Sequence, residues 1–347
     1  MAALLAIAEK LFADYGKCKI TINDEKEITV DGGKPLLSSL GGEKIFLPSA
    51  CGGRGTCGLC KLKVVLGGGT ILPTEEPLLT KEEQKTNFRL SCQLKVKRDL
   101  KIQLPDEIFA IKEYLCKCVE IKDLTSDMKQ FKLELIEPNS ISYTPGQYIQ
   151  LRTPPYGKNK EEAYRAYSIS SDPADKNFIE LIIRLVPGGI CTTYCFEHLK
   201  VGDEVKINGP YGQFRLTETD APIVFVAGGS GMAPIKCMLH YMKNTGNKRH
   251  AVYYFGANKV NELVCSELMK KFESDLPNFK FVPVVSNPQE KWDGQRGLVT
   301  DAVKQNLKDA PQYEAYFCGS PGMIDALVKL FKEFGTGEDK IFYDKFE

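Results

Sequence analysis

The stretch that decides the fold is Cys51-Gly-Gly-Arg-Gly-Thr-Cys57-Gly-Leu-Cys60, and a fourth cysteine, Cys92, follows further along the chain. Glycines occupy most positions between the first three thiols. Glycine accepts positive φ and lets backbone N–H groups come close to a bound group, so the loop is expected to fold tightly around something its sulfurs hold. A [2Fe–2S] cluster takes four thiolates, although the usual plant-type spacing C-x4-C-x2-C is one residue shorter than the one here.

Other uses of these four cysteines are weaker. Structural zinc sites usually combine two C-x2-4-C pairs, and only Cys57 and Cys60 form such a pair. A disulfide framework is disfavoured because nothing marks the chain as secreted. The sequence therefore favours an iron–sulfur cluster held by Cys51, Cys57, Cys60 and Cys92, with zinc and inert thiols as the alternatives.

The bulk composition describes an ordinary soluble chain of two or three domains. It has 347 residues, of which 43% are hydrophobic and 26% charged. A formal net charge of +1 gives no reason to expect nucleic acid or an anionic membrane surface as a partner. Twelve cysteines, most of them scattered, fit a reducing compartment, so we expect the cytoplasm.

Residues 1–16 are expected to form a short N-terminal helix. The run is apolar only as far as Ala8, which is too short to cross a bilayer. The helix would pack on the first domain or on a partner, and a remnant of a removed membrane anchor is the alternative.

Residues 17–108 read as a small β-rich domain. Alternating strands, a short helix after Pro35 and the cysteine loop follow in the order of a β-grasp ferredoxin. The run Leu90–Val96 is predicted to be a strand, which would hold Cys92 rigidly against the loop.

Residues 112–216 carry short strands between turn signals, a spacing that predicts an antiparallel β-barrel. Within it, Arg165 offers a cation for a pyrophosphate and Tyr167 a flat ring for an isoalloxazine. The segment from Gly189 to Thr192 opens a predicted helix, whose first N–H groups would face phosphate. Each signal alone is weak, and their order and spacing strengthen them.

Residues 220–347 alternate strands and helices, which predicts a parallel sheet with ligands beyond its carboxyl ends. Two of these ends carry glycines, at 228–234 and at 318–321. The first is not a G-x-G-x-x-G fingerprint because Pro234 takes the last position. A helix is predicted over Val260–Phe272. No acidic residue ends the second strand, where Phe255-Gly256-Ala257 stands.

The segments GGSGMAP, YFGA, CGSP, RAYS and GGICTT, in this chain, resemble the ferredoxin–NADP⁺ reductase superfamily. With the fused N-terminal [2Fe–2S] domain, the chain most resembles the F component of the sodium-pumping NADH:quinone reductases. The likeness covers about residues 17–347. It includes the C-x5-C-x2-C spacing, the GGGTILPTE run at 67–75 and the RLSCQ segment at 89–93.

The resemblance implies bound FAD, with Arg165, Tyr167 and Ser168 as ligands, Tyr148 nearby and Phe346 covering the flavin. Ser168 and Cys318 are the candidates for groups beside flavin N5 and the nicotinamide. The full set of implied cofactor-binding residues is Tyr148, Arg165, Tyr167, Ser168, Gly189, Ile190, Cys191, Thr192, Gly228, Gly229, Gly231, Met232, Pro234, Cys318, Gly319 and Phe346.

The implied function is electron transfer from NADH through FAD and the [2Fe–2S] cluster to an external one-electron acceptor, a protein or a quinone. NADH is preferred over NADPH because Lys259 is the only cation near the second strand's end. The alternatives are the reductase component of an oxygenase and a non-catalytic iron–sulfur carrier or sensor. The resembled family has a transmembrane helix that this chain lacks, so membrane association would come only through a partner or a removed anchor.

Overall fold

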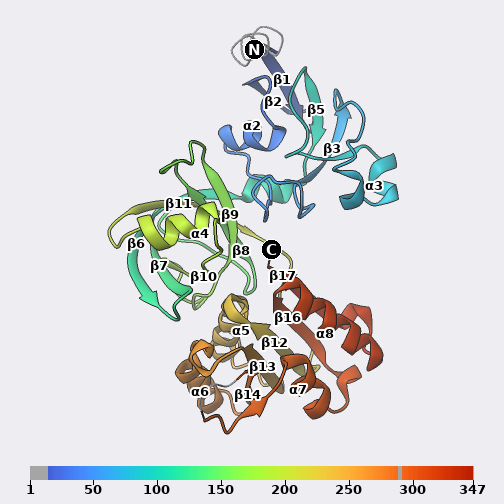
Figure 1. The fold of residues 1–347 in the computed structure, drawn as a ribbon. Helices are drawn as coiled ribbons and strands as arrows, with labels where there is room; N and C mark the ends of the chain where they lie inside the picture. The colour runs from blue at the N-terminus through green and yellow to red at the C-terminus, as the bar shows by residue number, and fades with distance from the viewer. Residues whose placement is uncertain (1–14, 288–290, 347) are drawn as a thin grey trace, which may run out of the picture. The chain divides into compact units, whose positions relative to one another are not determined.

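The structure, a computed structural model, describes residues 15–287 and 291–346 (Figure 1). It divides the chain into two compact units. The first comprises Met1–Glu113 with Gln150–Arg152 and Ala163–Ala166, and the second comprises the rest. The helix predicted for residues 1–16 falls, except for its last two positions, outside the described residues.

The first unit contains a five-stranded mixed sheet with a helix against it. Helix α2 (Leu36–Gly42) buries Leu36 and Leu40 completely, in one core cluster with Ile20 and Ile22 of the sheet. The first two strands pair antiparallel and the first and last pair parallel, which is the predicted β-grasp architecture. In spatial order the strands are β2 (Lys26–Asp31), β1 (Lys17–Ile22), β5 (Leu100–Gln103), β3 (Lys61–Leu66) and β4 (Phe88–Leu90).

The predicted strand over Leu90–Val96 is wrong. Strand β4 ends at Leu90, and Cys92 lies in a tight turn immediately after it. The N–H groups of Gln93 and Leu94 both donate to the Leu90 carbonyl, at 2.9 and 3.1 Å. These local bonds replace the ladder bonds of a strand, so it is a closed turn that presents the Cys92 thiol.

A six-stranded antiparallel sheet curls into the predicted barrel. The continuation of its last strand closes it, because Ile169 bridges to Leu181 and Ser170 N–H donates to Glu180 O at 2.8 Å. In spatial order the strands are β10 (Phe178–Arg184), β7 (Met128–Glu137), β6 (Lys112–Asp123), β11 (Glu204–Tyr211), β8 (Tyr148–Thr153) and β9 (Ala163–Ser168).

The remainder of the second unit is a parallel sheet with helices on both faces (Figure 1). Alternate residues of its central strand point to opposite sides: Phe225 packs in one core cluster and Val226 in the other. Helices α5 (Met232–Thr245) and α6 (Ser266–Asp275) cover the first face, and α7 (Val299–Asn306) and α8 (Pro321–Glu333) the second. In spatial order the strands are β15 (Gln295–Arg296), β14 (Phe279–Val285), β13 (Ala251–Ala257), β12 (Ile223–Gly228), β16 (Glu314–Gly319) and β17 (Ile341–Lys345).

Two local differences from the sequence prediction lie in this α/β part. The predicted helix Val260–Phe272 is broken: a single 3₁₀ turn over Val260–Glu262 ends before α6, and Cys265 between them has φ 56°. A residue in the left-handed region cannot continue a helix. Strand β17 was not predicted, and it pairs with β16 so that Asp344 lies opposite Cys318.

Candidate functional site

The four cysteines of the first unit lie in two pairs. Cys57 Sγ donates to Cys51 Sγ at 3.4 Å, and Cys60 is hydrogen-bonded to Cys92. Cys57 is half-buried and the other three are buried. The hydrogen bond from Cys57 lowers the pKa of Cys51 against the effect of burial, and thiolate is the form that binds iron.

Paired thiols fit a binuclear centre better than a mononuclear one. Each iron of a [2Fe–2S] cluster takes two protein thiolates, whereas a zinc ion needs all four around one point. Across residues 15–287 and 291–346, no three His, Cys, Asp or Glu side chains gather so that they could hold a single metal ion. The residues present therefore suit a [2Fe–2S] cluster, with one pair for each iron.

The Cys60–Cys92 pair is held by backbone as well as by sulfur. Ser91 N–H donates to Cys60 O at 3.0 Å, which joins the end of the cysteine loop to the turn after β4. Leu90 packs in one buried cluster with both thiols. The two parts of the sequence that carry the pair are thus fixed to each other.

In the second unit, the glycine turn after β12 meets the end of β16. A side chain at Gly231 would place its Cβ 2.2 Å from Cys318 O, so only glycine allows this approach. Gly319 O in turn accepts from Phe346 N–H at 2.9 Å. The structure therefore brings together three of the predicted segments: the turn at 228–231, Cys318-Gly319 and the C-terminal Phe346.

Ser168 joins this group through a residue that the sequence did not single out. Its hydroxyl donates to Asp344 Oδ2 at 3.4 Å. Burial raises the pKa of Asp344 to about 6, against the lowering effect of the Ser168 hydrogen bond. Cys318 is fully buried, and burial followed by the nearby Asp344 raises the pKa of its thiol, which is therefore neutral at pH 7.

The remaining predicted FAD residues keep to their own strands and turns. Arg165 and Tyr167 lie on β9, and Arg165 Nη1 donates to Tyr164 O at 2.7 Å. The Tyr148 ring stacks on Tyr211 with centroids 5.4 Å apart.

The segment Gly189–Thr192 opens a helix, as predicted, but some of its polar groups are used within the turn. Gly189 N–H donates to Val186 O at 2.9 Å, and the Thr192 hydroxyl accepts from Val186 N–H at 3.2 Å. Helix α4 (Ile190–Thr193) is short and runs into a π-turn over Tyr194–His198. Cys191 is buried beneath it.

Two charged residues beside the nucleotide turn were missed. Arg184 is paired with Asp127 at 2.6 Å, and its Nη1 lies 3.1 Å from where a Cβ on Gly229 would stand. Glu262 folds back so that its carboxylate accepts from Asn258 N–H, just after β13, at 3.1 Å. The expectation that no acidic group stands at the second strand's end is therefore wrong, because the 3₁₀ turn returns Glu262 to it.

Comparison with known proteins agrees with this layout. Family models match in chain order the 2Fe-2S iron-sulfur cluster binding domain over residues 20–97, the oxidoreductase FAD-binding domain over 115–216 and the oxidoreductase NAD-binding domain over 225–329. The F component of the Na(+)-translocating NADH-quinone reductase of Neisseria gonorrhoeae, one of its subunits, is 34% identical, over 100% of this chain and 96% of its own length. The corresponding protein of Marinomonas sp. is 33% identical over 100% and 95%.

The chain belongs to the family of these F components of Na⁺-translocating NADH-quinone reductases. It is an oxidoreductase with NADH, FAD and a [2Fe–2S] cluster as its cofactors. Among solved structures, the Amycolatopsis cytochrome P450 reductase GcoB is similar, with TM-score 0.76, 26% identity and coverage of 95% of this chain and 98% of its own. The ferredoxin reductase in carbazole 1,9a-dioxygenase has TM-score 0.73 and 25% identity, with coverage of 96% and 99%. Within the described ranges, no helix has the length and apolarity to span a membrane.

The cysteine pairs lead to a test of the ligand set. Cys92→Ala removes half of one pair, so the purified protein is expected to retain little or no cluster iron, measured by iron analysis and visible absorption. Cys18→Ala, at a buried thiol of the same sheet, is the matched control and should keep the wild-type iron content. Wild-type iron in Cys92→Ala would remove Cys92 from the ligand set.

Proposed function

We propose that this chain takes electrons from NADH and delivers them singly to an external acceptor through its [2Fe–2S] domain. The observation that carries the proposal is the meeting of the glycine turn at 228–231, Cys318-Gly319 and Phe346, with Ser168 joined to them through Asp344. When bound, FAD takes the two electrons of a hydride and the cluster carries one at a time. Cys51, Cys57, Cys60 and Cys92 are the proposed cluster ligands.

The protein's own groups orient the reactants and hold protons in place. Above about pH 6 the Asp344 carboxylate is ionised and accepts from the Ser168 hydroxyl, which fixes the direction of that hydroxyl. The neutral Cys318 thiol lies at the end of β16, beside Gly231, where the nicotinamide is proposed to bind. Phe346, held by its N–H to Gly319, is proposed to cover the flavin until the nicotinamide displaces it.

The acceptor is proposed to be the quinone-reducing machinery of a membrane assembly. Full-length similarity to the F component of a Na(+)-translocating NADH-quinone reductase supports this choice. On that proposal the protein works in the cytoplasm and meets the inner membrane through a partner. The second candidate is an oxygenase component, which the similarity to a P450 reductase and a carbazole dioxygenase reductase supports.

The order of electron transfer has a direct test in the Cys92→Ala protein loaded with FAD. NADH oxidation with ferricyanide is expected to stay within about twofold of wild type, because this small acceptor can take electrons from reduced flavin. Reduction of cytochrome c, a one-electron protein acceptor, should fall at least about tenfold because the cluster is missing. Equal losses with both acceptors, or none with cytochrome c, would contradict the proposed order.

The preference for NADH is proposed to depend on Glu262. A carboxylate at the end of the second strand hydrogen-bonds a ribose 2′-OH and repels a 2′-phosphate. In Glu262→Gln the ratio of kcat/KM for NADH over NADPH is expected to fall by about tenfold, the value of one charged hydrogen bond. Glu267→Gln, at an exposed carboxylate on α6, is the control and should leave the ratio unchanged. An unchanged ratio in Glu262→Gln would assign the preference to other groups.

A further inference from the structure

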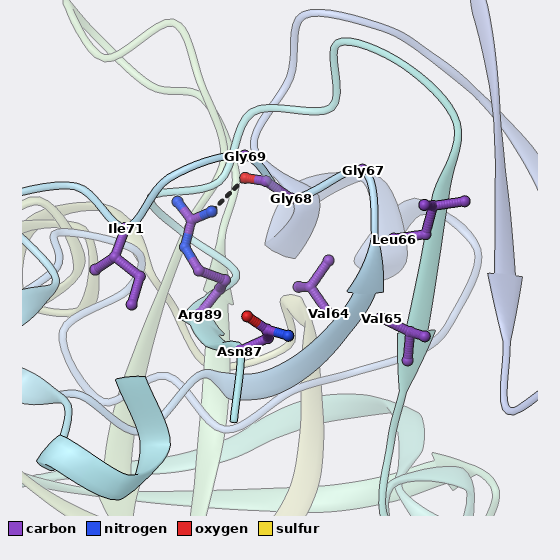
Figure 2. A pocket seen from close by; sticks show the side chains of 9 residues that line it. All are labelled: Val64, Val65, Leu66, Gly67, Gly68, Gly69, Ile71, Asn87 and Arg89. Atoms are coloured by element: carbon purple, nitrogen blue, oxygen red, sulfur yellow. Dashed lines mark hydrogen bonds between the residues drawn. The ribbon is translucent and has the colours of Figure 1, made fainter. Parts of the chain in front are cut away.

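Two segments that support the family resemblance have no part in the proposed function, namely 67–75 and 89–93. In the structure they bind each other. Glu75 is fully buried and Arg89 almost so, and Arg89 Nε lies 2.9 and 3.0 Å from the two Glu75 carboxylate oxygens. Figure 2 shows Arg89 also reaching Gly68 O, beside a hollow of about 200 Å³. The ion pair thus joins the glycine turn after β3 to strand β4.

Backbone bonds to the same carboxylate fix the turn that carries it. Leu72 N–H donates to Glu75 Oε2 at 2.9 Å, and Leu90 N–H donates to Oε1 at 2.8 Å. A buried carboxylate with this many donors holds its neighbours in one position. Thr74, the residue before Glu75, is therefore held at a set place relative to the turn that contains Cys92.

Thr74 makes the second link, to Gln93. Its hydroxyl donates to Gln93 Oε1 at 3.1 Å, which leaves the amide nitrogen pointing the other way. That nitrogen, Nε2, donates to Cys92 Sγ at 3.6 Å. Adjacent residues of one segment, Thr74 and Glu75, therefore hold Gln93 and Arg89 of the other, on either side of Cys92.

The cysteine loop leaves room for this amide. A Cβ on Gly55 would stand 2.5 Å from Gln93 Nε2, and Gly55 has φ +75°, so a larger residue is excluded on both counts. Gln93 itself is half-buried, where a hydrogen bond is less weakened by water than on the open surface.

We propose that Gln93 raises the reduction potential of the [2Fe–2S] centre through its N–H···S bond to Cys92, and that Thr74 is a positioning residue that keeps the amide turned to the sulfur. Cys92 Sγ, a thiol here, is the atom that carries the thiolate charge when iron is bound. One-electron reduction adds negative charge to the centre and its sulfurs, so a donor to sulfur favours the reduced form. The inference depends on the proposed role of Cys92 as a ligand.

The test is a redox titration of the full-length, FAD- and cluster-loaded protein, with the EPR signal of the reduced cluster as the readout. Gln93→Met keeps the side-chain length and removes the donor. Its midpoint potential is expected to be lower, by up to about tenfold in the one-electron reduction equilibrium, which corresponds to about 59 mV. Gln103→Met, at an exposed glutamine of β5, is the matched control and should keep the wild-type potential.

A double-mutant cycle separates tuning from a general loss of structure. Thr74→Val should lower the potential less than Gln93→Met, and it should have no further effect when Gln93 is already methionine. If Gln93→Met fails to hold iron, Thr74→Val alone gives the sign. An unchanged potential in loaded Gln93→Met, or a Thr74→Val shift of equal size in both backgrounds, would overturn the proposal. Failure of the ligand assignment is recognised separately, by wild-type iron content in Cys92→Ala.

Discussion

The close approach of two strand ends is the constraint on which the nucleotide side of the molecule depends. Gly231, after β12, touches the backbone of Cys318 at the end of β16, with no space for a β-carbon. Parallel pairing of β12 with β16 places both carboxyl ends at one edge of the sheet. Strand β17 then continues the sheet beyond β16, so the chain's last residues reach the same edge. The site therefore follows from sheet topology, and few side-chain contacts are needed to assemble it.

The cysteine centre is built on a different physical basis. Its loop is held to the rest of the first unit by a buried ion pair, by short backbone bonds around β4 and by the packing of Leu90 against both Cys60 and Cys92. Breaking one partner of a buried pair costs about 3–5 kcal/mol, because it leaves an uncompensated charge. Glu75 and Arg89 are thus structural requirements for the site. Gln93 and Thr74 are more exposed, and their contribution is directed at one sulfur.

Much of this arrangement could be predicted from sequence, because it depends on local pattern. Alternating runs located the barrel strands, and the strand Lys61–Leu66 has the predicted bounds. Short-range bonds defeated the strand prediction at Cys92, where two N–H groups return to Leu90, and left-handed φ at Cys265 defeated the helix prediction over Val260–Phe272. Asp344, Glu262 and Arg184 were missed because tertiary folding, and not spacing, brings each to its site. The domain boundaries at 108, 112, 216 and 220 stay a prediction.

The central claim is that one chain accepts electrons in pairs and holds them in two kinds of centre. An anaerobic titration of the fully loaded protein with NADH tests it most directly, with flavin absorbance and the EPR signal of the reduced cluster followed together. We predict full reduction at about 1.5 NADH per protein, two electrons for FAD and one for the cluster, with the EPR signal rising as the flavin bleaches. An endpoint at about one NADH with bleached flavin and no cluster signal would contradict it.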